Sequence, residues 1–420
     1  MRSLADWLDQ QQKSHPSAID LDLTRVRSVA QRLRLLPPPY RTITVAGTNG
    51  KGSTVACLDW LLRVAHKRVG RFTSPHLVRY NERICIDGKE ASDADLIASF
   101  ERIEAARGAT TLTFFEYNTL AALDLFTRAN VDVAVLEVGL GGRLDATNIV
   151  DADVGVVCSI GLDHAEWLGD SLEQIGREKA GIFRAGRPAV LGSEQMPASV
   201  WQVIEQLGAH PVAPGRQYRV RRHGDLWDFE FGKSKLVDLP LPSMAGEHQV
   251  RNAATAIAAI VALAAQDVVH PLDRWEVRRA LSLVHVPGRF QRVPGEVEWI
   301  LDVAHNVPAA ETLRDNLRRV PRARRTLAIC GILGDKDIRG ITSTVAGEID
   351  AWIPVTLGGP RAVSAEQIAQ QLPANASVLS CAADVAEACR AARAAARPGE
   401  RVLVFGSFLT VGPALEFLRL

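Results

Sequence analysis

The chain has 420 residues, 47% of them hydrophobic and 23% charged, which is a globular composition in a chain too long for one hydrophobic core. We therefore expect two domains. Its 49 basic and 48 acidic residues give a formal net charge of +1, which argues against nucleic acid as the main partner, so the arginine-rich segments 318–319 and 322–325 are interpreted as solvated helix ends.

The cysteines and the apolar segments bear on the compartment in which the protein works. The six cysteines are scattered, with no CxxC pair and no nearby histidine at zinc-ligand spacing, which predicts a reduced, cytoplasmic protein without structural zinc. The N-terminus lacks the apolar region of a signal peptide. The longest apolar run, residues 253–265, is too short for a membrane span and predicts a buried helix instead, so we expect no membrane partner.

The first predicted strand, residues 42–45, leads into the most informative segment of the chain. Thr42-Ile-Thr-Val-Ala-Gly-Thr-Asn-Gly-Lys-Gly-Ser-Thr54 joins a β-branched run to a glycine-rich turn and a helix-forming segment. Such a turn can point successive N–H groups at phosphate oxygens, while a lysine reaches the terminal phosphates and a hydroxyl holds magnesium. Val45 replaces the first glycine of the generic P-loop pattern, and Gly52 separates Lys51 from the hydroxyl. An ordinary glycine-rich turn is the alternative, and a nucleotide phosphate site is the favoured interpretation.

Further apolar runs predict buried strands of a parallel sheet, since both faces of such strands are covered. They lie at residues 133–138, 154–159 and 188–191. Residues 218–241 alternate polar and apolar side chains and predict a small antiparallel excursion from this sheet.

Polar groups follow two of these strands, where ligands bind in open parallel sheets. Glu137 ends one strand before a glycine-rich turn, and its carboxylate could hold magnesium or merely cap a helix. Asp163 and His164 follow the next strand, and we favour His164 as a ligand because the neighbouring strands carry Glu137 and the phosphate loop. Lys179, by itself, is interpreted as a surface lysine with a salt bridge.

Two prolines and two glycines between residues 286 and 295 predict a boundary, with domains at 1–286 and 296–420 and a linker at 287–295. Later apolar runs predict a compact second α/β domain. They lie at residues 299–303, 327–330, 352–357, 377–379 and 402–405. Arg289, Asp302, His305 and Ser407 follow strands or lie in the linker, and we expect them to face one cleft with polar groups of the first domain.

Together these motifs resemble those of the bifunctional dihydrofolate synthase/folylpolyglutamate synthase family, part of the Mur ligase superfamily, from about Ile19 to the C-terminus. The segments that carry the resemblance are Ala-Gly-Thr-Asn-Gly-Lys-Gly-Ser, Thr-Ser-Pro-His-Leu-Val-Arg-Tyr-Asn-Glu-Arg, Leu-Glu-Val-Gly-Leu-Gly-Gly-Arg-Leu-Asp-Ala-Thr-Asn and Asp-Val-Ala-His-Asn. The resemblance implies an α/β fold with a large P-loop domain, a smaller Rossmann-like C-terminal domain on the glutamate side, and ATP between them.

The resemblance also implies an ATP-dependent ligase. A carboxylate of dihydropteroate or of a folate would be phosphorylated to an acyl phosphate, and L-glutamate would then displace the phosphate. Two Mg²⁺ ions and a monomeric protein are implied as well. The alternatives are another Mur-type ligase, acting on a cell-wall precursor, and a P-loop ATPase or kinase. A kinase would not need a second domain that presents Asp302 and His305 to the nucleotide.

Site residues carried over by motif fall into four groups. Those for ATP are Thr48, Asn49, Gly50, Lys51, Gly52, Ser53, Asn252, Arg289 and Asp302. Those for magnesium are Ser74, Glu137 and His164. Those for the pterin are Asp20, Leu21, Asp22, Leu23, Thr113, Phe114, Phe115, Glu116, Leu144, Asp145 and Ala146. Those for glutamate are His305 and Ser407.

Three of these assignments have a specific chemical content. Phe114 and Phe115 offer stacking faces, and the carboxylates among the pterin residues can accept hydrogen bonds from pterin N–H groups. The family commonly has glycine where Asp22 stands. The family's lysine in Glu-Lys-Ala-Gly-Ile is carbamoylated, which implies a catalytic, carbamoylated Lys179 that supplies two oxygens to a second Mg²⁺, beside catalytic Lys51 and His164.

Overall fold

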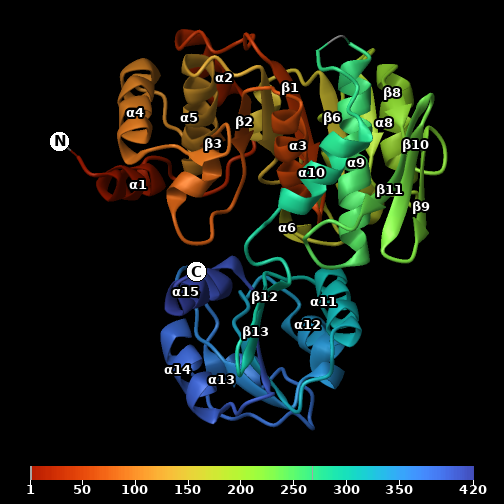
Figure 1. Ribbon diagram of the computed structural model, residues 1–420. Helices are drawn as coiled ribbons and strands as arrows, with labels where there is room; N and C mark the ends of the chain where they lie inside the picture. The colour runs from red at the N-terminus through yellow and green to blue at the C-terminus, as the bar shows by residue number, and fades with distance from the viewer. Residues whose placement is uncertain (1, 267) are drawn as a thin grey trace. The chain divides into compact units, whose positions relative to one another are not determined.

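The chain forms two compact units, drawn in Figure 1 from a computed structural model that describes residues 2–266 and 268–420. The first unit contains the chain up to Pro75 and the segments Asn81–Ser243 and Gln249–Val284. The second contains His285–Leu420, and two short segments, His76–Tyr80 and Met244–His248, join it from earlier in the chain.

An eight-stranded sheet forms the centre of the first unit, in the order β4-β3-β2-β5-β1-β6-β7-β8. Its strands are β1 Arg41–Ala46, β2 Val69–Phe72, β3 Ile84–Ile86, β4 Lys89–Glu90, β5 Val133–Glu137, β6 Val154–Val157, β7 Pro188–Leu191 and β8 His210–Val212. The six strands β2, β5, β1, β6, β7 and β8 are parallel to one another. At one edge of the sheet, β3 pairs with β2 and β4 pairs with β3, both antiparallel. In the centre, Val45 of β1 pairs with Glu137 of β5 and with Val156 of β6, so these strands end at the same edge of the sheet.

Helices cover both faces of this sheet, which explains why its central strands are continuously apolar. They are α1 Leu4–Lys13, α2 Thr24–Arg32, α3 Lys51–Val64, α4 Asp93–Arg107, α5 Phe114–Arg128, α6 Ala165–Leu168, α7 Leu172–Ala180, α8 Ala198–Leu207, α9 Glu247–Ala264 and α10 Arg274–Leu283. Two 3₁₀ turns, Tyr80–Arg83 and Ala146–Ile149, complete the connections. The run at 253–265 lies almost entirely in α9 and is buried there, which confirms the helix predicted for it.

The antiparallel excursion predicted between residues 218 and 241 is confirmed. It is a separate three-stranded sheet of β9 Tyr218–His223, β10 Leu226–Phe231 and β11 Ser234–Pro240. Trp227 and Phe229 alternate with polar residues along β10 and are fully buried, and the indole of Trp227 donates a hydrogen bond to the carbonyl of Pro240 at 2.8 Å. Each such buried aromatic stabilises the fold by roughly 1.5–3 kcal/mol.

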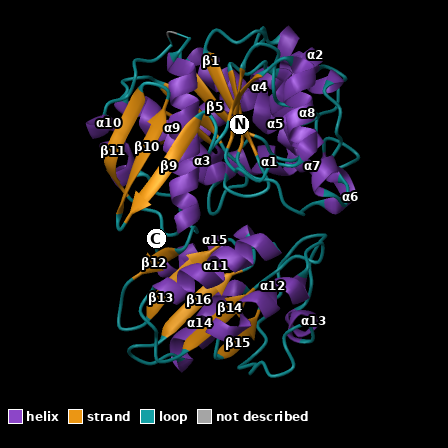
Figure 2. Ribbon diagram, turned by 90° about the vertical axis from the view of Figure 1, so that its right-hand side faces the viewer, coloured by secondary structure: helices purple, strands orange, loops and turns teal. Residues whose placement is uncertain are grey.

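The second unit is built on a five-stranded sheet in the order β12-β13-β16-β14-β15, which Figure 2 shows with helices on both faces. The strands are β12 Gln291–Val293, β13 Glu298–Asp302, β14 Thr326–Cys330, β15 Ala351–Pro354 and β16 Arg401–Phe405, and only β12 is antiparallel. The helices are α11 Val307–Arg319, α12 Ile338–Val345, α13 Ala365–Ala369, α14 Val385–Ala395 and α15 Phe408–Leu418, with a 3₁₀ turn at Ala346–Glu348.

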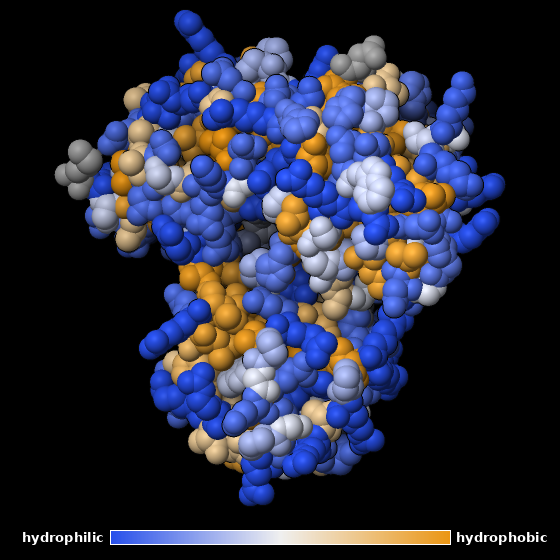
Figure 3. Space-filling model, in the orientation of Figure 1, coloured by the Kyte–Doolittle hydropathy of each residue, from blue (hydrophilic) through white to orange (hydrophobic). Residues whose placement is uncertain are grey.

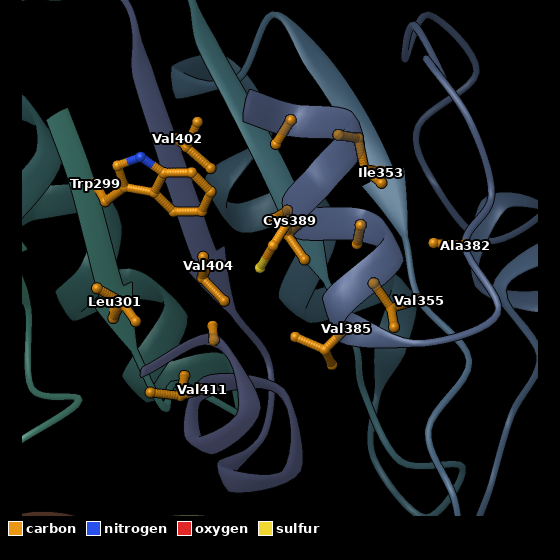
Figure 4. Packing of buried hydrophobic residues seen from close by; sticks show 14 of the residues in the cluster. Trp299, Leu301, Ile353, Val355, Ala382, Val385, Cys389, Val402, Val404 and Val411 are labelled. Carbon is orange, nitrogen blue, oxygen red and sulfur yellow. The ribbon is translucent and has the colours of Figure 1, made fainter. Parts of the chain in front are cut away.

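Side chains that alternate along the strands of this sheet pack into two hydrophobic cores, one on each face. Trp299 and Leu301 pack on the side of α14 and α15 with Cys389 and Val411, as Figure 4 shows from close by. Ile300, between them in sequence, packs on the opposite side against α11 and α12. This period of two is what a strand with both faces covered requires.

One detail of the predicted second unit is wrong. Residues 377–379 form no strand: only an isolated bridge joins Val378 to Trp352, and Val378 and Leu379 are 42% and 46% exposed, so this short run lies at the surface. The segment 287–295, expected to connect the domains, includes the short strand β12, which pairs with β13. The α/β fold class itself is confirmed.

The surface seen in Figure 3 is mainly hydrophilic, with hydrophobic residues in several groups, the broadest of them on the left of the second unit. The most exposed large hydrophobic side chain among the described residues is Trp275, at 66%. Among the same residues, every helix is too short or too polar to cross a membrane.

Candidate active site

The glycine-rich turn after β1 has the backbone that a phosphate loop requires. Gly50 has a φ of 88° and is the N-cap residue of α3, which begins at Lys51. A Cβ atom at Gly50 would also lie 2.6 Å from Oδ1 of Asn252, so only glycine fits. Gly52 and the buried Ser53 lie in the first turn of α3, where N–H groups point out of the helix toward an anion.

The end of β6 holds this loop in place. Thr48 donates its N–H to the carbonyl of Ser159 at 2.8 Å, and its hydroxyl donates to the carbonyl of Gly161 at 3.0 Å. Asn49 donates its N–H to the hydroxyl of Ser159 at 3.0 Å. The ammonium of Lys51 donates to the carbonyl of Gly47 at 2.9 Å, within the loop itself. These hydrogen bonds fix the backbone conformation of the loop.

The predicted magnesium residues lie at the same edge of the sheet. Glu137 is the last residue of β5 and only 4% exposed, and its carboxylate accepts the N–H of Ser74 at 3.3 Å. His164 follows β6 and has a φ of 52°, and its Nε2 lies 3.9 Å from a carboxylate oxygen of Asp163. A buried carboxylate, a serine and an imidazole are a donor set that fits a divalent cation. The structure thus brings Ser74 and Glu137 into contact, and His164 is paired with Asp163.

Lys179 is not a surface lysine, because its side chain is only 5% exposed. Burial, joined by the positive charge of Lys51, lowers the pKa of Lys179 to about 7, while the carboxylates of Asp163 and Asp145 oppose this shift. The glycine turn after β5 packs directly on α7: a Cβ atom at Gly142 would lie 2.9 Å from the carbonyl oxygen of Lys179. That close approach holds α7 against the turn, and the effect of the Lys51 charge on the pKa of Lys179 shows that the two lysines lie near each other.

Three of the carboxylates predicted to bind the pterin contact the same arginine, Arg25, which the sequence analysis did not identify. Nη1 of Arg25 lies 2.8 Å from Asp20 and 3.6 Å from Asp22, and Nη2 lies 3.3 Å from Glu116. Imidazole Nε2 of His15 lies 3.1 Å from Asp20. Arg25 follows Asp22 at helical spacing, and this i to i+3 pairing was the only signal in the sequence that could have indicated it.

Several of these pterin residues already have structural roles. Glu116 and Thr113 form the capping box of α5, with the N–H of Thr113 donated to Glu116 at 2.7 Å. Asp22 accepts the N–H of Thr24 at 2.9 Å, and burial raises the pKa of Asp145, whose carboxylate accepts N–H groups from Leu140 and Thr147. The aliphatic members lie beside them: Leu21, Leu23 and Leu144 are half-buried, and Ala146 is buried.

The two phenylalanines predicted to stack on the pterin also have partners. The guanidinium of Arg83 lies 5.4 Å from the ring centroid of Phe114. The rings of Phe115 and Phe72 are 5.7 Å apart, and a Cβ atom at Gly139 would lie 2.6 Å from the ring of Phe115. Phe115 therefore helps to pack the glycine turn.

In the second unit, Asp302 ends β13 as a half-buried acceptor. Its carboxylate accepts the N–H groups of Phe290 and Ala304, each at 2.8 Å. Burial raises the pKa of Asp302 to about 6, against the lowering effect of the positive charge of Arg289 and of these two hydrogen bonds. The carboxylate is thus held rigidly beside an arginine.

The other candidates of the second unit gather around Phe408. The guanidinium of Arg289 lies 5.4 Å from the centroid of this ring, and the imidazole of His305 lies 6.1 Å from it. Nδ1 of His305 is 2.8 Å from the carbonyl oxygen of Val303, and the hydroxyl of Ser407 caps α15 by accepting the N–H of Leu409 at 3.1 Å. These residues therefore form one cluster at the carboxyl ends of β13 and β16.

A phosphate loop beside a buried carboxylate, with a second α/β unit on a mainly parallel sheet, is the arrangement expected of a Mur-type ligase. Two family models agree: the Mur ligase middle domain matches residues 45–260, and the Mur ligase, glutamate ligase domain matches residues 288–408.

Individual relatives narrow the class. The dihydrofolate synthase/folylpolyglutamate synthase of Escherichia coli (strain K12) is 45% identical over 99% of this chain and 95% of its own. The solved structure of Escherichia coli FolC in complex with DHPP and ADP has 44% identity and a TM-score of 0.93, covering 100% of this chain and 98% of its own. A bifunctional folylpolyglutamate synthase/dihydrofolate synthase solved with Mn, AMPPNP and L-glutamate has 44% identity and a TM-score of 0.91, covering 100% and 99%. The chain belongs to the dihydrofolate synthase/folylpolyglutamate synthase family.

Proposed function

We propose that the protein is an ATP-dependent ligase that joins L-glutamate to dihydropteroate, giving dihydrofolate, and to the γ-carboxylate of folates. The observation that carries the proposal is the shared end of β1 and β5, which sets the phosphate loop beside the buried carboxylate of Glu137. Similarity to enzymes of this activity along nearly the whole chain supports the folate substrates over a cell-wall precursor. It also speaks against a simple P-loop ATPase or kinase.

Two displacements make up the reaction. The substrate carboxylate attacks the γ-phosphorus of ATP, ADP leaves, and an acyl phosphate remains. The amino group of L-glutamate then attacks the acyl carbon, a C–N bond forms as the C–O bond to phosphate breaks, and the nitrogen loses a proton. The phosphate loop, with Thr48 to Ser53, would bind the phosphates, and Lys51 would offset their charge.

Magnesium is the cofactor of the proposed reaction, with ATP as co-substrate. Ser74, Glu137 and His164 would hold one ion, and this ion would neutralise charge on the transferred phosphoryl group. We place Asn252, Arg289 and Asp302 at the nucleotide. His305 and Ser407 are proposed for glutamate, which agrees with the glutamate ligase domain matched to this part of the chain.

Lys179 is proposed as a carbamoylated residue. Its pKa of about 7 means that a large share of the amine is neutral near pH 7, as attack on carbon dioxide requires. The lone pair of Nζ forms a bond to the carbon, one proton leaves, and the product carries a negative charge where an ammonium stood. Its two oxygens would hold a second magnesium ion, which an ammonium would repel.

Residues 1–286 are proposed as the nucleotide- and pterin-binding part, 287–295 as the connection, and 296–420 as the glutamate side. We also propose that the protein acts as a cytoplasmic monomer, without nucleic acid or membrane partners. All six cysteines are free, which agrees with a reducing compartment.

The test is incubation of the purified protein with ATP, Mg²⁺ and L-glutamate plus dihydropteroate, tetrahydrofolate or a muramyl peptide. We expect glutamate-dependent release of ADP with the two pterins, and products that mass spectrometry identifies as dihydrofolate and glutamylated folate. Release of ADP with the muramyl peptide alone would replace the proposal with a cell-wall ligase, and release without any glutamate requirement would indicate an ATPase or kinase.

A further inference from the structure

A cavity of about 300 Å³ lies in the second unit, at the amino ends of the parallel strands β14 and β16. Thr326 and Arg401, the first residues of these strands, line it together with the end of α11 and the loop that follows. The candidates Asp302 and Ser407 stand at the opposite, carboxyl ends of the strands, so this cavity is separate from them.

Four arginines line the cavity, namely Arg318, Arg322, Arg324 and Arg401. Two carboxylates, Glu348 and Asp350, line it as well, and a third, Glu298, pairs with Arg401, so four positive charges face three negative ones. Like charges held this close repel one another, and an anion bound among the arginines would relieve that repulsion.

Arg401 forms the buried part of this site, since it is only 4% exposed. Its Nε and Nη2 lie 2.9 and 2.8 Å from a carboxylate oxygen of Glu298, and Nη2 also donates to the carbonyl of Pro321 at 2.8 Å. Within the described part of the chain, no acceptor meets Nη1. Nε and Nη2 are used within the protein, so Nη1 is the group left for a ligand in the cavity.

The other three arginines differ in how far they are engaged. Arg318 is paired with Glu348 at 2.7 Å, and Asp350 is partly used by the N–H of Thr326, also at 2.7 Å. The side chains of Arg322 and Arg324 form no hydrogen bond or ion pair with any residue that the structure describes. Their guanidinium groups are therefore available.

Solvated helix ends do not account for this arrangement. A basic residue in the last turn of α11, such as Arg318, complements the negative end of the helix dipole. Arg322 and Arg324 lie in the loop beyond that turn, and Arg401 begins a strand, so the dipole explains none of them.

We propose that this cavity binds a small, doubly charged oxyanion, with inorganic phosphate as the ligand. Planar guanidinium groups match the spacing of phosphate oxygens and bind them with paired, charge-assisted hydrogen bonds. The buried Arg401 would donate to the anion from a fixed position, and the exposed Arg322 and Arg324 would donate to it from the surface loop. The site does not use the phosphate loop and stands independently of the proposed ligase activity.

Calorimetric titration of inorganic phosphate into the full chain tests the proposal. The titration is done at constant ionic strength, with Mg²⁺ and ADP saturating, so that the phosphate loop is occupied. The double variant Arg322→Ala/Arg324→Ala removes two exposed side chains without internal partners, so its fold should persist, as its thermal midpoint can show. We expect phosphate to bind the wild type and to bind this variant at least tenfold more weakly.

A matched control removes the same charge elsewhere in the second unit. Arg339 and Arg390 are exposed and do not line the cavity, so Arg339→Ala/Arg390→Ala should bind phosphate within twofold of the wild type. The proposal fails if the wild type does not bind phosphate under these conditions. It fails equally if both double variants weaken binding alike, since the effect would then be one of net charge.

Discussion

At the scale of single residues, the active-site chemistry depends on side chains taken out of water. Glu137 is a carboxyl group kept at the end of a buried strand, and Lys179 is an amine whose charged form is disfavoured by burial and by Lys51. The sequence could predict Glu137 from its place after a strand. It could not predict the burial of Lys179, because α7 packs on segments distant along the chain, such as the glycine turn after β5.

Glu137→Gln keeps the shape of the side chain and removes its charge. We expect turnover to fall by about a thousandfold, since metal-assisted phosphoryl transfer loses a stabilising interaction of several kcal/mol. The thermal midpoint should change little. Turnover and melting of wild type and variant at limiting magnesium check this, and wild-type turnover of the variant would exclude Glu137 as a ligand.

Lys179 should take up carbon dioxide at a lower pH than an ordinary lysine. Because its pKa is about 7 and the ordinary value is 10.5, the neutral amine becomes the main form above about pH 7. At fixed dissolved ¹³CO₂, we expect the carbamate signal in ¹³C NMR to rise between about pH 6 and 8 and then level off.

Two controls accompany that measurement. Lys179→Ala should lose both the carbamate signal and the ligase activity, and added acetate should restore part of the activity by supplying a carboxylate. A carbamate signal that keeps rising beyond pH 9, or that persists in Lys179→Ala, would assign the modification to another lysine.

Arg25 is expected to position the acceptors of the pterin site. Arg25→Met removes charge-assisted hydrogen bonds to Asp20 and Glu116, each worth about 1.5–3 kcal/mol. The KM for dihydropteroate should rise at least tenfold while the KM for ATP stays unchanged. Arg25→Lys should recover part of the loss, and Arg27→Met, at an exposed position of the same helix, should have no effect. An equal rise in both KM values would mean a general loss of structure.

At the scale of elements, strands were predicted correctly where the apolar run was long because both faces of the strand are covered. The strands near Val45, Glu137 and Val156 were predictable because covered faces demand continuous apolar runs. The run at 377–379 has the same character over three residues and stays exposed. β2 escaped prediction because Arg71 interrupts four residues that are otherwise small or apolar.

The glycine turn after β5 offers a test at this scale. In Gly142→Ala the new Cβ would lie 2.7 Å from the carbonyl oxygen of Glu178, so the turn and α7 must separate. We expect a loss of about 1–3 kcal/mol in the free energy of unfolding and a larger loss of activity, because Lys179 moves with α7. Gly358→Ala is the control, since its Cβ would meet no atom within 4 Å. Unchanged activity in Gly142→Ala would show that the position of α7 does not matter.

At the scale of the whole molecule, the two units were predictable in number and class, and the path of the chain was not. Composition and length indicated two domains, and the proline- and glycine-rich segment indicated where one follows the other. The short segments His76–Tyr80 and Met244–His248 belong to the second unit although the first unit surrounds them in sequence. No local pattern marks such a crossing, because it is defined by contacts distant along the chain.

A substitution of Leu77 tests whether the segment His76–Tyr80 belongs to the second unit. Leu77 is half-buried against the core of the second unit, and a Cβ atom at Gly412 of α15 would lie 2.0 Å from its carbonyl oxygen. Leu77→Ala should therefore destabilise the second unit by about 1–2 kcal/mol, since part of a leucine side chain leaves the core. Hydrogen exchange should accelerate in α15 and β16, whereas exchange in α3 and β1 should stay at the wild-type rate. Val78→Ala, a truncation at a neighbouring exposed position, should leave both regions unchanged. Faster exchange in α3 and β1 alone would assign this segment to the first unit.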